Sequence, residues 1–498
     1  MTETTSPTIE LIDSLELDIG HAGARRVYCN RDLNLASIQW VGFDMDYTLA
    51  IYRQVPFDRL CYDLTLRRLI DHYGYPEALL ERPYDDQFAI RGLVIDRRHG
   101  HVIKMNVFRH VGKGMHGLRP LDDAERLRYR KEPPRVSSSR FRLIDTLFEL
   151  PEAYLYAVIV DHLEAHGAAV NFERIADDVR AAIDTVHADG SLKSKVTESI
   201  ATYISRDSEL AGALHRLRSS GKKLFLLTNS DITYTRAVMS YLLDGRIEGY
   251  QGWRAYFDVV ITDARKPSFF RGEAPFLRVA DDGTVLGAET EGFTRGANYA
   301  NGNIGCFERF IGLGGDEVLY VGDHIFGDIL RSKLDSNWRT AMIIPEMERE
   351  LESTDTIHDV NLAWYDAQVR LNGLHREIEA RNDAIQRLRT IAADTASEAE
   401  RARIDRLTRP LVRHVDQLKR QARALLDRTF EYQQRFDSAF HERWGSLFKE
   451  GNELSLFGSQ VASFACIYTS RASNLGFYSP MHYFRSPPHT MPHEELRR

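Results

Sequence analysis

The sequence predicts an α/β protein: a Rossmann-like parallel sheet with an inserted α+β cap and a C-terminal helical segment. Short apolar runs that end in small polar or acidic residues recur along the chain, as buried parallel strands do. Segments of helical periodicity separate these runs, and that alternation favours an open parallel sheet. From about residue 360 apolar residues repeat every three or four positions over long stretches, which is typical of paired helices.

Five apolar runs are the predicted strands of the sheet. They have the length of buried strands and are bounded by turn-forming residues. The runs are residues 38–41, 223–227, 256–262, 317–321 and 340–344. A helical pattern separates the second run from the third, so the sheet is expected to be built from strand-helix-strand units.

The same patterns divide the chain into a core and four further parts. The long insertion into the core mixes helical patterns with β-like runs, of which 91–95 and 101–105 are expected to pair as a hairpin. The predicted parts are a lead-in at 1–33, the core at 34–50 and 215–350, the insertion at 51–214, a helical hairpin at 351–449, and an aromatic-rich segment at 450–498 that packs on the body.

Two prolines are expected to interrupt helices. Apolar residues at helical spacing run from 141 to 163, and Pro151 should divide this stretch into two helices. In the second long helical stretch Pro410 predicts a break or restart, with Thr408 as the cap of the helix that follows.

Composition argues against several classes of function. Lys and Arg total 65 against 72 Asp and Glu, and the net charge of −7 argues against wholesale binding to nucleic acid or an anionic membrane. The basic stretch 401–428 is typical of a solvated helix face, with an RNA or acidic-partner surface as the alternative. Four cysteines without a CxxC pair suggest neither a zinc site nor a disulfide framework. No leader and no run of ~20 apolar residues is evident, so a cytoplasmic protein without a membrane span is expected.

The segment Gly42-Phe43-Asp44-Met45-Asp46-Tyr47-Thr48 follows the first predicted strand. Both carboxylates are therefore expected where the chain leaves the sheet, at the edge where α/β proteins bind their ligands. Asp44 and Asp46 would face the same way, and two like charges that close require a cation or a shared proton; a divalent metal is favoured. Taken alone, such a pair could also be a polar strand end.

Three further predicted strands end in residues of complementary chemistry. The carboxyl ends of parallel strands meet at one edge of a sheet, so these side chains are expected beside Asp44 and Asp46. They are Thr228, Asn229 and Ser230 after the second strand, Lys266 after the third, and Asp323 and Asp328 after the fourth. A carboxylate nucleophile, a carboxylate proton donor, groups that hold phosphoryl oxygens and acidic ligands for a hard cation are what phosphoryl transfer requires. Lys266 and a Mg²⁺ ion would balance the four carboxylates.

In this order the four sets resemble the motifs of the haloacid dehalogenase-like phosphatase superfamily. Segments 42–50, 263–267 and 322–330 narrow the resemblance to the cytosolic purine 5'-nucleotidases that prefer IMP and GMP, and 477–480 is similar to that family's C-terminal part. The resemblance covers most of residues 25–350 and returns after 450. It implies a haloacid dehalogenase-like core, a Mg²⁺ cofactor, a phospho-aspartate intermediate and a homo-oligomer.

The resemblance also implies roles for single residues. Asp44 becomes the phospho-aspartate, and Asp46 gives a proton to the departing 5'-oxygen and then takes one from water. Asp44, Asp323 and the backbone carbonyl of Asp46 hold Mg²⁺, with Asp328 supporting them from outside. The residues that hold the phosphoryl oxygens are Thr228, Asn229, Ser230, Lys266 and Lys193. The non-catalytic alternatives are a turn residue for Thr228, a surface lysine for Lys266 and a helix-start residue for Asp328.

An insertion between the first and second motifs is where this superfamily places a cap that covers the site and selects the substrate. Arg180, Asp184 and His187 are spaced to share one helix face. The resemblance implies that Arg180 donates to a 6-oxo group, that Asp184 bonds nearby polar edges, and that His187 and Phe148 sandwich the purine ring. An exposed ion pair of Arg180 with Asp184 and a core position for Phe148 are the structural alternatives.

Asp145 and Glu149 stand where that family usually carries amides. A carboxylate at either position could accept from the purine N1-H and from a guanine 2-amino group, so 6-oxopurines should be preferred over adenine. The expected function is Mg²⁺-dependent hydrolysis of IMP and GMP, with phosphoryl transfer to another nucleoside as a side reaction. A phosphatase for another phosphomonoester and a scaffold protein that works through helices 365–445 are the alternatives.

Overall fold

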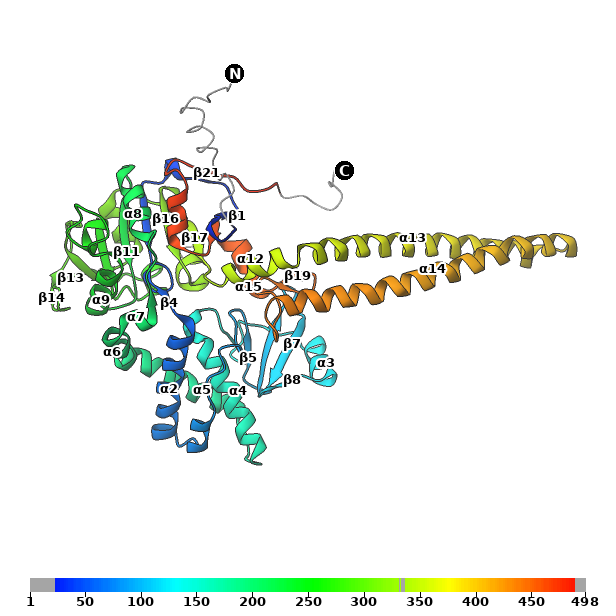
Figure 1. Ribbon diagram of the computed structural model, residues 1–498, viewed down its shortest axis with the longest axis horizontal. Helices are drawn as coiled ribbons and strands as arrows, with labels where there is room; N and C mark the ends of the chain where they lie inside the picture. Colours follow the sequence, from blue (N-terminus) through cyan, green and yellow to red (C-terminus); the bar gives the residue numbers. More distant parts are fainter. Residues whose placement is uncertain (1–22, 331, 333–335, 489–498) are drawn as a thin grey trace, which may run out of the picture. The chain divides into compact units, whose positions relative to one another are not determined.

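The computed structural model describes residues 23–330, 332 and 336–488. The described residues belong to two compact units. One unit comprises the chain up to Glu348 together with the chain from Leu447, and the other is Arg349–Ser446 (Figure 1). The parts of the predicted lead-in and of the predicted C-terminal segment that fall on 1–22 and 489–498 lie outside the described residues.

The larger unit contains a ten-stranded sheet in the order β1-β20-β17-β16-β3-β11-β12-β15-β13-β14. Its strands are β1 (Tyr28–Cys29), β3 (Trp40–Phe43), β11 (Lys223–Leu227), β12 (Val259–Thr262), β13 (Phe276–Val279), β14 (Val285–Ala288), β15 (Asn298–Asn301), β16 (Val318–Gly322), β17 (Arg339–Ile343) and β20 (Ile467–Thr469). From β20 to β15 the neighbouring strands are parallel, while β1, β13 and β14 pair antiparallel. The predicted α/β class and parallel sheet are confirmed.

Strand β3 is the centre of this sheet. It pairs with β11 on one side and with β16 on the other, both in parallel. The chain first extends the sheet through β11 and β12 and later returns to the other side of β3 for β16 and β17. Loops that leave β3 and its neighbours therefore diverge at its carboxyl end, which is the switch point where open α/β sheets bind ligands.

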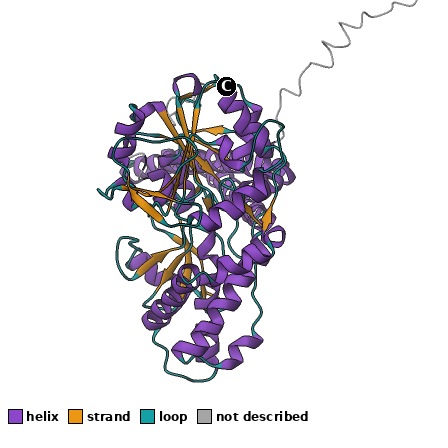
Figure 2. Ribbon diagram, turned by 90° about the vertical axis from the view of Figure 1, so that its left-hand side faces the viewer, coloured by secondary structure: helices purple, strands orange, loops and turns teal. Residues whose placement is uncertain are grey.

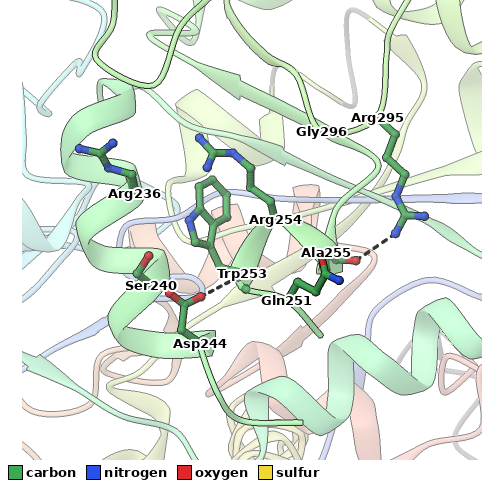
Figure 3. A pocket seen from close by; sticks show the side chains of 10 residues that line it. Arg236, Ser240, Asp244, Gln251, Trp253, Arg254, Ala255, Arg295 and Gly296 are labelled. Atoms are coloured by element: carbon green, nitrogen blue, oxygen red, sulfur yellow. Dashed lines mark hydrogen bonds between the residues drawn. The ribbon is translucent and has the colours of Figure 1, made fainter. Parts of the chain in front are cut away.

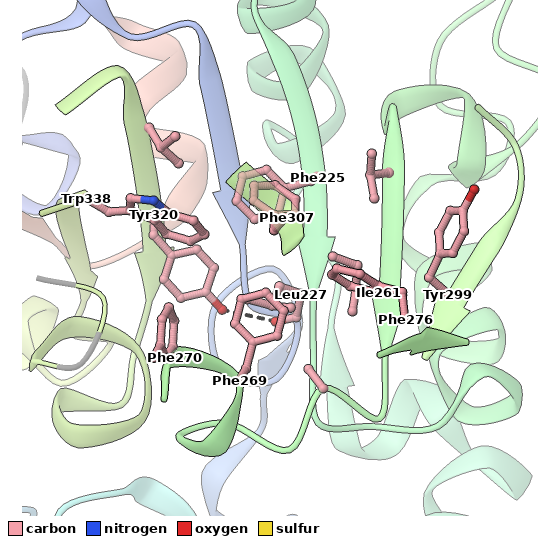
Figure 4. Packing of buried hydrophobic residues seen from close by; sticks show 13 residues of the cluster. Phe225, Leu227, Ile261, Phe269, Phe270, Phe276, Tyr299, Phe307, Tyr320 and Trp338 are labelled. Carbon is pink, nitrogen blue, oxygen red and sulfur yellow. Dashed lines mark hydrogen bonds between the residues drawn. The ribbon is translucent and has the colours of Figure 1, made fainter. Parts of the chain in front are cut away.

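Helices flank the sheet on both sides (Figure 2). They are α8 (Leu210–Ser219), α9 (Ile232–Leu243), α10 (Ile304–Ile311) and α15 (Leu456–Phe464). On one face Phe225 of β11 packs among Phe307, Tyr320 and Trp338 in an aromatic cluster (Figure 4). Gly42 of β3 faces the same ring so closely that a Cβ there would lie 2.1 Å from its Cζ. The absence of a side chain at position 42 is thus a condition of this packing.

The chain between β3 and β11 forms an α+β insertion. It leaves and re-enters the core through β4 (Ile51–Tyr52) and β10 (Ile204–Ser205), which pair antiparallel. Its antiparallel sheet has the order β8-β7-β6-β5-β9, with β5 (Val94–Asp96), β6 (His101–Met105), β7 (Val111–His116), β8 (Arg119–Pro120) and β9 (Phe141–Leu143). Its helices are α2 (Gln54–Tyr73), α3 (Asp123–Lys131), α4 (Leu150–Ala165), α5 (Phe172–Ala188), α6 (Ser191–Glu198) and α7 (Ile200–Tyr203). The pairing of β5 with β6 confirms the hairpin predicted there.

The prediction that Pro151 divides two helices is wrong. The stretch before it forms strand β9 and a 3₁₀ turn, Leu147–Glu149, and Pro151 lies in the first turn of α4. The first turn tolerates proline because an amide there has no intrahelical acceptor, and the fixed φ suits a helix start. Pro151 therefore marks the beginning of a helix.

The smaller unit is a helical hairpin. Helices α13 (His358–Asp394) and α14 (Glu398–Ala439) pack along one another, and their buried residues include Ile385 on α13 and Val415 and Leu418 on α14. The break predicted at Pro410 is wrong, because α14 continues through it. Thr408 caps nothing, since its hydroxyl donates to the carbonyl of Ile404 within the helix at 2.9 Å. Packing along a partner helix offsets the ~3 kcal/mol that an internal proline costs.

The remaining elements include α12 (Met347–Thr356) and two short antiparallel pairs. Strand β2 (Leu33–Asn34) pairs with β21 (Tyr483–Phe484), and β18 (Lys449–Glu450) pairs with β19 (Glu453–Leu454). Within the described part of the chain, no helix combines the length and the apolar character that crossing a bilayer requires.

Candidate active site

Asp44 is the first residue after β3 and is fixed by its neighbours. Its backbone amide donates to the carbonyl of Val321 at 2.9 Å, which continues the pairing of β3 with β16. Its Oδ1 accepts from the amide of Met45 at 2.7 Å and lies 2.9 Å from Lys266 Nζ. Burial raises the pKa of Asp44 well above its usual value, Lys266 opposes this shift, and Asp328 and Asp323 add to it.

Lys266 joins two carboxylates at the centre of the site. Its side chain is buried, and Nζ lies 2.6 Å from Asp328 Oδ1 as well as 2.9 Å from Asp44. Nζ also donates to the Tyr320 hydroxyl at 2.9 Å, and that hydroxyl donates to the carbonyl of Leu227. A buried lysine between two carboxylates is held cationic, so the surface-lysine alternative is excluded.

Asp323 offers an oxygen that is free to bind a cation. The residue is 3% exposed, and among the described residues its Oδ2 has no hydrogen-bond partner. One oxygen each of Asp44, Asp323 and Asp328 lie within 4.8 Å of one another. Burial and the nearby Asp328 raise the pKa of Asp323 to about 7. An orphaned buried carboxylate oxygen beside two further carboxylates fits a hard divalent cation such as Mg²⁺.

Asp46 is held by two hydroxyls rather than by a cation. Tyr52 donates to its Oδ1 at 2.7 Å and Ser230 to its Oδ2 at 2.9 Å. The Tyr52 hydroxyl also lies 2.8 Å from that of Tyr234 on α9. Burial raises the pKa of Asp46, and the two donated hydrogen bonds oppose the rise. A carboxyl whose proton is retained more strongly than usual and whose orientation is fixed can act as a general acid.

The loop after β11 mainly positions other groups. Thr228 is buried, and its hydroxyl accepts from the amide of Ser230 at 3.1 Å. Asn229 binds the backbone of Lys266 at both ends of its amide, donating at 3.0 Å and accepting at 2.6 Å. Ser230 is bound to Asp46, as described. The predicted residues are therefore together, but the side chains of Asn229 and Ser230 already serve Lys266 and Asp46.

The cap contributes an aromatic cluster next to Asp46. The ring of Phe148 lies 4.7 Å from Tyr47, 5.7 Å from Tyr52 and 5.5 Å from Phe57, measured between centroids. Phe148 and His187 are in contact edge to face, with centroids 5.6 Å apart and planes at 83°. A base stacked between two parallel rings needs roughly 7 Å between them. Phe148 and His187 are thus brought together, but they do not form the sandwich in this state.

Arg180 is surrounded by carboxylates. It pairs with Asp184 at 2.8 Å, Glu149 at 2.7 Å and Glu152 at 3.1 Å. Arg142 pairs with the same two glutamates, at 2.6 Å and 2.5 Å. Arg180 and Asp184 therefore form the ion pair that was the structural alternative to base recognition. This pair belongs to a larger network of carboxylates that uses the N-H donors of Arg180.

Asp145 and Lys193 also have partners within the protein. Asp145 Oδ2 lies 3.0 Å from His324 Nε2. This pair links the cap segment between β9 and α4 to the segment that follows β16. Lys193 Nζ lies 2.7 Å from Asp231 Oδ2 and stands over the ring of Tyr234 at 5.4 Å. Asp328 accepts from Lys266 and from the amide of His324, so it supports the site from beneath.

Sequence reasoning missed several residues of this site. Tyr52 and Tyr320 have the sequence context of ordinary strand residues. In the structure the Tyr52 hydroxyl donates to Asp46, and the Tyr320 hydroxyl accepts from Lys266. Arg91, which is fully buried, donates to the carbonyl of Asp323 at 2.9 Å and pairs with Glu346. An arginine inside an apolar run, as Arg91 is, was the one sequence signal that could have found it.

A pocket of about 510 Å³ lies between α9, residues 251–255 and residues 295–296, and none of the site residues above lines it (Figure 3). Arg254 in its wall donates to Asn298 at 3.0 Å and to Asp281 at 2.6 Å. Arg295 donates to the carbonyl of Ala255 at 3.1 Å. These arginines hold the surrounding loops together, and the pocket is not part of the active site.

Comparison with known proteins places this geometry in context. The sequence profile described as "5' nucleotidase family" matches residues 27–496. A 5'-nucleotidase domain-containing protein of Dictyostelium discoideum is 32% identical over 461 residues, which are 91% of this chain and 72% of that protein. The 5'-nucleotidase domain-containing protein 2 of Rattus norvegicus is 30% identical over 467 residues, 91% of this chain and 77% of its own.

A solved structure of a putative beta-phosphoglucomutase from Thermotoga maritima is also similar. It covers 62% of this chain and 86% of its own at 13% identity, with a TM-score of 0.23. That score is too low to support more than the sheet topology already shows.

Proposed function

Because the chain belongs to the 5' nucleotidase family, we propose that it is a Mg²⁺-dependent 5'-nucleotidase that acts on 6-oxopurine nucleoside monophosphates, IMP and GMP. A phosphoric monoester hydrolase is what membership of this family supports. The observation that carries the reaction is the convergence of Asp44, Asp323 and Asp328 at the ends of the central strands, where Lys266 pairs with Asp44 and Asp328. What we propose beyond this hydrolase class is that Mg²⁺ is the cofactor and that the substrate carries a 6-oxopurine base.

The first half of the reaction uses Asp44 and Asp46. A carboxylate oxygen of Asp44 forms a bond to phosphorus while the bond from phosphorus to the 5'-oxygen breaks. Asp46 transfers its proton to that 5'-oxygen, and burial, which raises the pKa of Asp46, favours the protonated form that this step requires. Lys266 would supply positive charge, and Thr228 a hydroxyl donor, to the transferring oxygens.

The second half regenerates Asp44. Asp46, now ionised, removes a proton from water as the water oxygen bonds to phosphorus, and the bond from phosphorus to Asp44 breaks. Phosphate leaves. A nucleoside 5'-hydroxyl in place of water would give the phosphotransferase side reaction. Asp44, Asp323 and the carbonyl of Asp46 would hold Mg²⁺, which supplies positive charge against the phosphoryl oxygens when bound.

The purine proposal rests on the cap residues near Asp46. Phe148, His187, Arg180 and Asp184 are close together, as stacking and edge recognition of a base require. For a base to enter, the rings of Phe148 and His187 must separate. Asp145 or Glu149 would then accept from the N1-H of the base once released from His324 or Arg180.

A second candidate is a phosphatase for another, smaller phosphomonoester. Two contacts favour it: the edge-to-face contact of Phe148 with His187, and the three carboxylates on Arg180. In that case the cap contacts are structural and only the chemistry at Asp44 is retained.

The test is phosphate release from purine and pyrimidine monophosphates, sugar phosphates and p-nitrophenyl phosphate, with and without Mg²⁺. We expect Mg²⁺-dependent release that is fastest with GMP or IMP and lost in Asp44→Asn. Asp282→Asn, at an exposed loop carboxylate, is the matched control. Release from sugar phosphates but from no purine nucleotide would replace the first candidate by the second. No release from any substrate would leave a scaffold role for the hairpin.

We further propose that the protein is cytoplasmic and self-associates. The four cysteines are free thiols, which suits a reducing compartment. Exposed apolar side chains on the hairpin, among them Leu362, Tyr365 and Phe430, provide surface for a second copy. No nucleic-acid partner is proposed. Sedimentation velocity of the purified chain tests the assembly.

A further inference from the structure

Arg91 is a buried cation that joins the cap to the core. It lies just before β5, and its side chain is 0% exposed. Its Nε and Nη2 donate to the two carboxylate oxygens of Glu346, at 2.7 Å and 2.6 Å. Glu346 follows β17, and β17 runs parallel to β16, so this pair lies at the same edge of the sheet as Asp323. The cap is therefore anchored next to the proposed metal site.

The third donor of Arg91 binds the backbone of that site. Its Nη1 donates to the carbonyl oxygen of Asp323 at 2.9 Å. The amide of His324 belongs to the same peptide unit and donates to Asp328 Oδ2 at 3.3 Å. The peptide that follows Asp323 is thus bound at its oxygen and at its hydrogen. Because a peptide unit is planar, these two bonds fix its orientation and the ψ angle of Asp323.

The orientation of this peptide determines where the Asp323 side chain begins. On the other side of Asp323 the backbone is fixed by β16, whose last residue, Gly322, pairs with Met342 of β17. With the peptides on both sides held, the direction of the bond from Cα to Cβ of Asp323 is set. The Oδ2 of Asp323 is the buried oxygen that has no hydrogen-bond partner among the described residues. Arg91 therefore arranges a ligand oxygen before any cation arrives.

Arg91 is itself held by its surroundings. The amide of Gly92 donates to the carbonyl of Ile144 at 2.7 Å, and the amide of Ile144 donates to the carbonyl of Leu93 at 2.8 Å. On the core side the guanidinium carbon lies over the ring of Phe457, 4.9 Å from its centroid. A Cβ at Gly92 would stand 2.7 Å from that of Phe457, so the segment packs closely on the core. The guanidinium is thus a fixed point for the Asp323 peptide.

Neutralising Glu346 does not by itself require an arginine. The Glu346 side chain is 27% exposed, and the charge of a lysine would balance it equally well. The planar fork of an arginine, however, binds a carboxylate along one edge and still has a donor for the Asp323 carbonyl. The single nitrogen of a lysine cannot reproduce these three directed bonds. The residue type therefore matches the contact with the active site.

We propose that Arg91 is a positioning residue that sets the affinity of the active site for its divalent cation by holding the peptide after Asp323. This inference rests on the proposed Mg²⁺ site. Arg91 acts through the backbone of Asp323, and replacing a residue that supports a metal ligand in this way typically weakens metal binding about 10- to 100-fold. Because Arg91 belongs to the cap, the cap would contribute to metal binding as well as to substrate choice.

Mn²⁺ tests this inference without a substrate, because it prefers the same oxygen ligands as Mg²⁺. The full chain is stripped with a chelator and titrated, and the free ion is followed by electron paramagnetic resonance. Asp323→Asn identifies the site by its loss. Arg91→Lys keeps the charge and should weaken Mn²⁺ binding at this site about tenfold.

Phosphate release gives a second measurement. In Arg91→Lys the Mg²⁺ concentration for half the maximal rate should rise by a similar factor, with smaller changes in the rate at saturating Mg²⁺ and in the KM for the nucleotide. Arg140→Lys is the matched control, because Arg140 binds Asp96 inside the cap with the same fork, at 2.9 Å and 2.7 Å. It should leave the Mn²⁺ affinity unchanged.

If Arg91→Lys does not fold, Glu346→Asp carries the test, since it keeps both charges but shortens the anchor of Arg91 by one methylene. Unchanged Mn²⁺ affinity in whichever of these variants folds would overturn the inference and leave the proposed function intact. Equal weakening in Arg140→Lys would overturn it as well, because any loosening of the cap would then suffice. A native chain without an Asp323-dependent Mn²⁺ site would overturn the proposed metal and this inference with it.

Discussion

The Tyr52 hydroxyl donates to Asp46, and the effect of this one hydrogen bond on the proton of Asp46 can be measured. Its bond to Asp46 stabilises the ionised carboxylate, so Tyr52→Phe should raise the pKa of Asp46. Because Asp46 must be protonated to act as the general acid, the high-pH limb of the rate profile should move to higher pH. We expect about a tenfold loss of kcat with a nucleotide, whose alkoxide leaving group needs the proton, and a smaller loss with p-nitrophenyl phosphate.

Tyr234→Phe is the control for this prediction, since the Tyr234 hydroxyl contacts that of Tyr52, whereas Tyr52 and Ser230 are the described donors to Asp46. It should have the weaker effect on both substrates. Equal losses with the two leaving groups would show that Tyr52 acts on folding or binding rather than through the proton of Asp46.

At the residue scale, the motif residues could be predicted because their types and spacing are local. Asp44, Lys266 and Asp323 each follow an apolar run, and parallel strands bring such ends together. The partners of the cap residues could not be predicted this way. Asp145 meets His324, which is 179 residues away, and Arg180 meets Glu152, which a helix pattern hides. Only the folded chain reveals which charges neutralise one another.

The packing of strand β3 against β11 depends on the absence of a side chain at Gly42. A Cβ at this position would stand 2.1 Å from a ring carbon of Phe225, which is enclosed by Phe307 and Trp338 and has no room to retreat. Gly42→Ala should therefore lower the free energy of unfolding by about 1–3 kcal/mol, measured by urea denaturation. Gly212→Ala on α8, where nothing lies within 4 Å, should be neutral or stabilising. Equal midpoints for the two variants would contradict this packing argument.

Helix α2 carries a buried carboxyl that makes stability depend on pH. Asp58 accepts from Gln54 and Tyr84, and burial raises its pKa to about 7. In the unfolded chain it ionises near pH 4, so between these values the folded state binds more protons and stability falls as pH rises. Asp58→Asn removes this loss.

The gain in unfolding free energy from Asp58→Asn over the native chain should thus be larger at pH 8 than at pH 5, by roughly 3 kcal/mol. Urea midpoints at the two pH values measure it, with Asp71→Asn on the same helix as the control for removing one charge. The same gain at both pH values would mean that Asp58 is ionised in the folded state.

At the element scale, the two prolines show where local patterns fail. A proline looks the same in the sequence whether a helix ends before it or begins at it. Because Phe141–Leu143 pairs with β5 as a strand, the α-helix of this stretch is α4, which begins next to Pro151. Pro410 would break an isolated helix, yet α14 continues because its apolar residues pack along α13. In both cases tertiary contacts outweigh the propensity of one residue.

At the scale of the molecule, the sequence predicts the centre of the large sheet better than its margins. Strands β3, β11, β12, β16 and β17 are strong local patterns. By contrast β1 and β20 are two and three residues long and pair across the chain, Tyr28 opposite Tyr468. Strands β13 to β15 form an antiparallel extension that no helical alternation announces. Short strands with distant partners carry too little local signal to be found.

Shortening the helical hairpin should leave the chemistry of the active site intact. Every residue of the active site lies in the larger unit, whereas α13 and α14 bury their apolar residues against one another. Residues 381–411 are centred on the turn between the two helices, so removing them and closing the ends with a short glycine-containing turn deletes paired residues together. The phosphate-release rate should stay within about twofold of the native value, because the contacts that orient Asp44, Asp46 and Lys266 are unchanged.

A loss of activity with an intact fold by circular dichroism would mean that the hairpin acts on the site, either through assembly or directly. Sedimentation velocity of the same variant would distinguish these two routes.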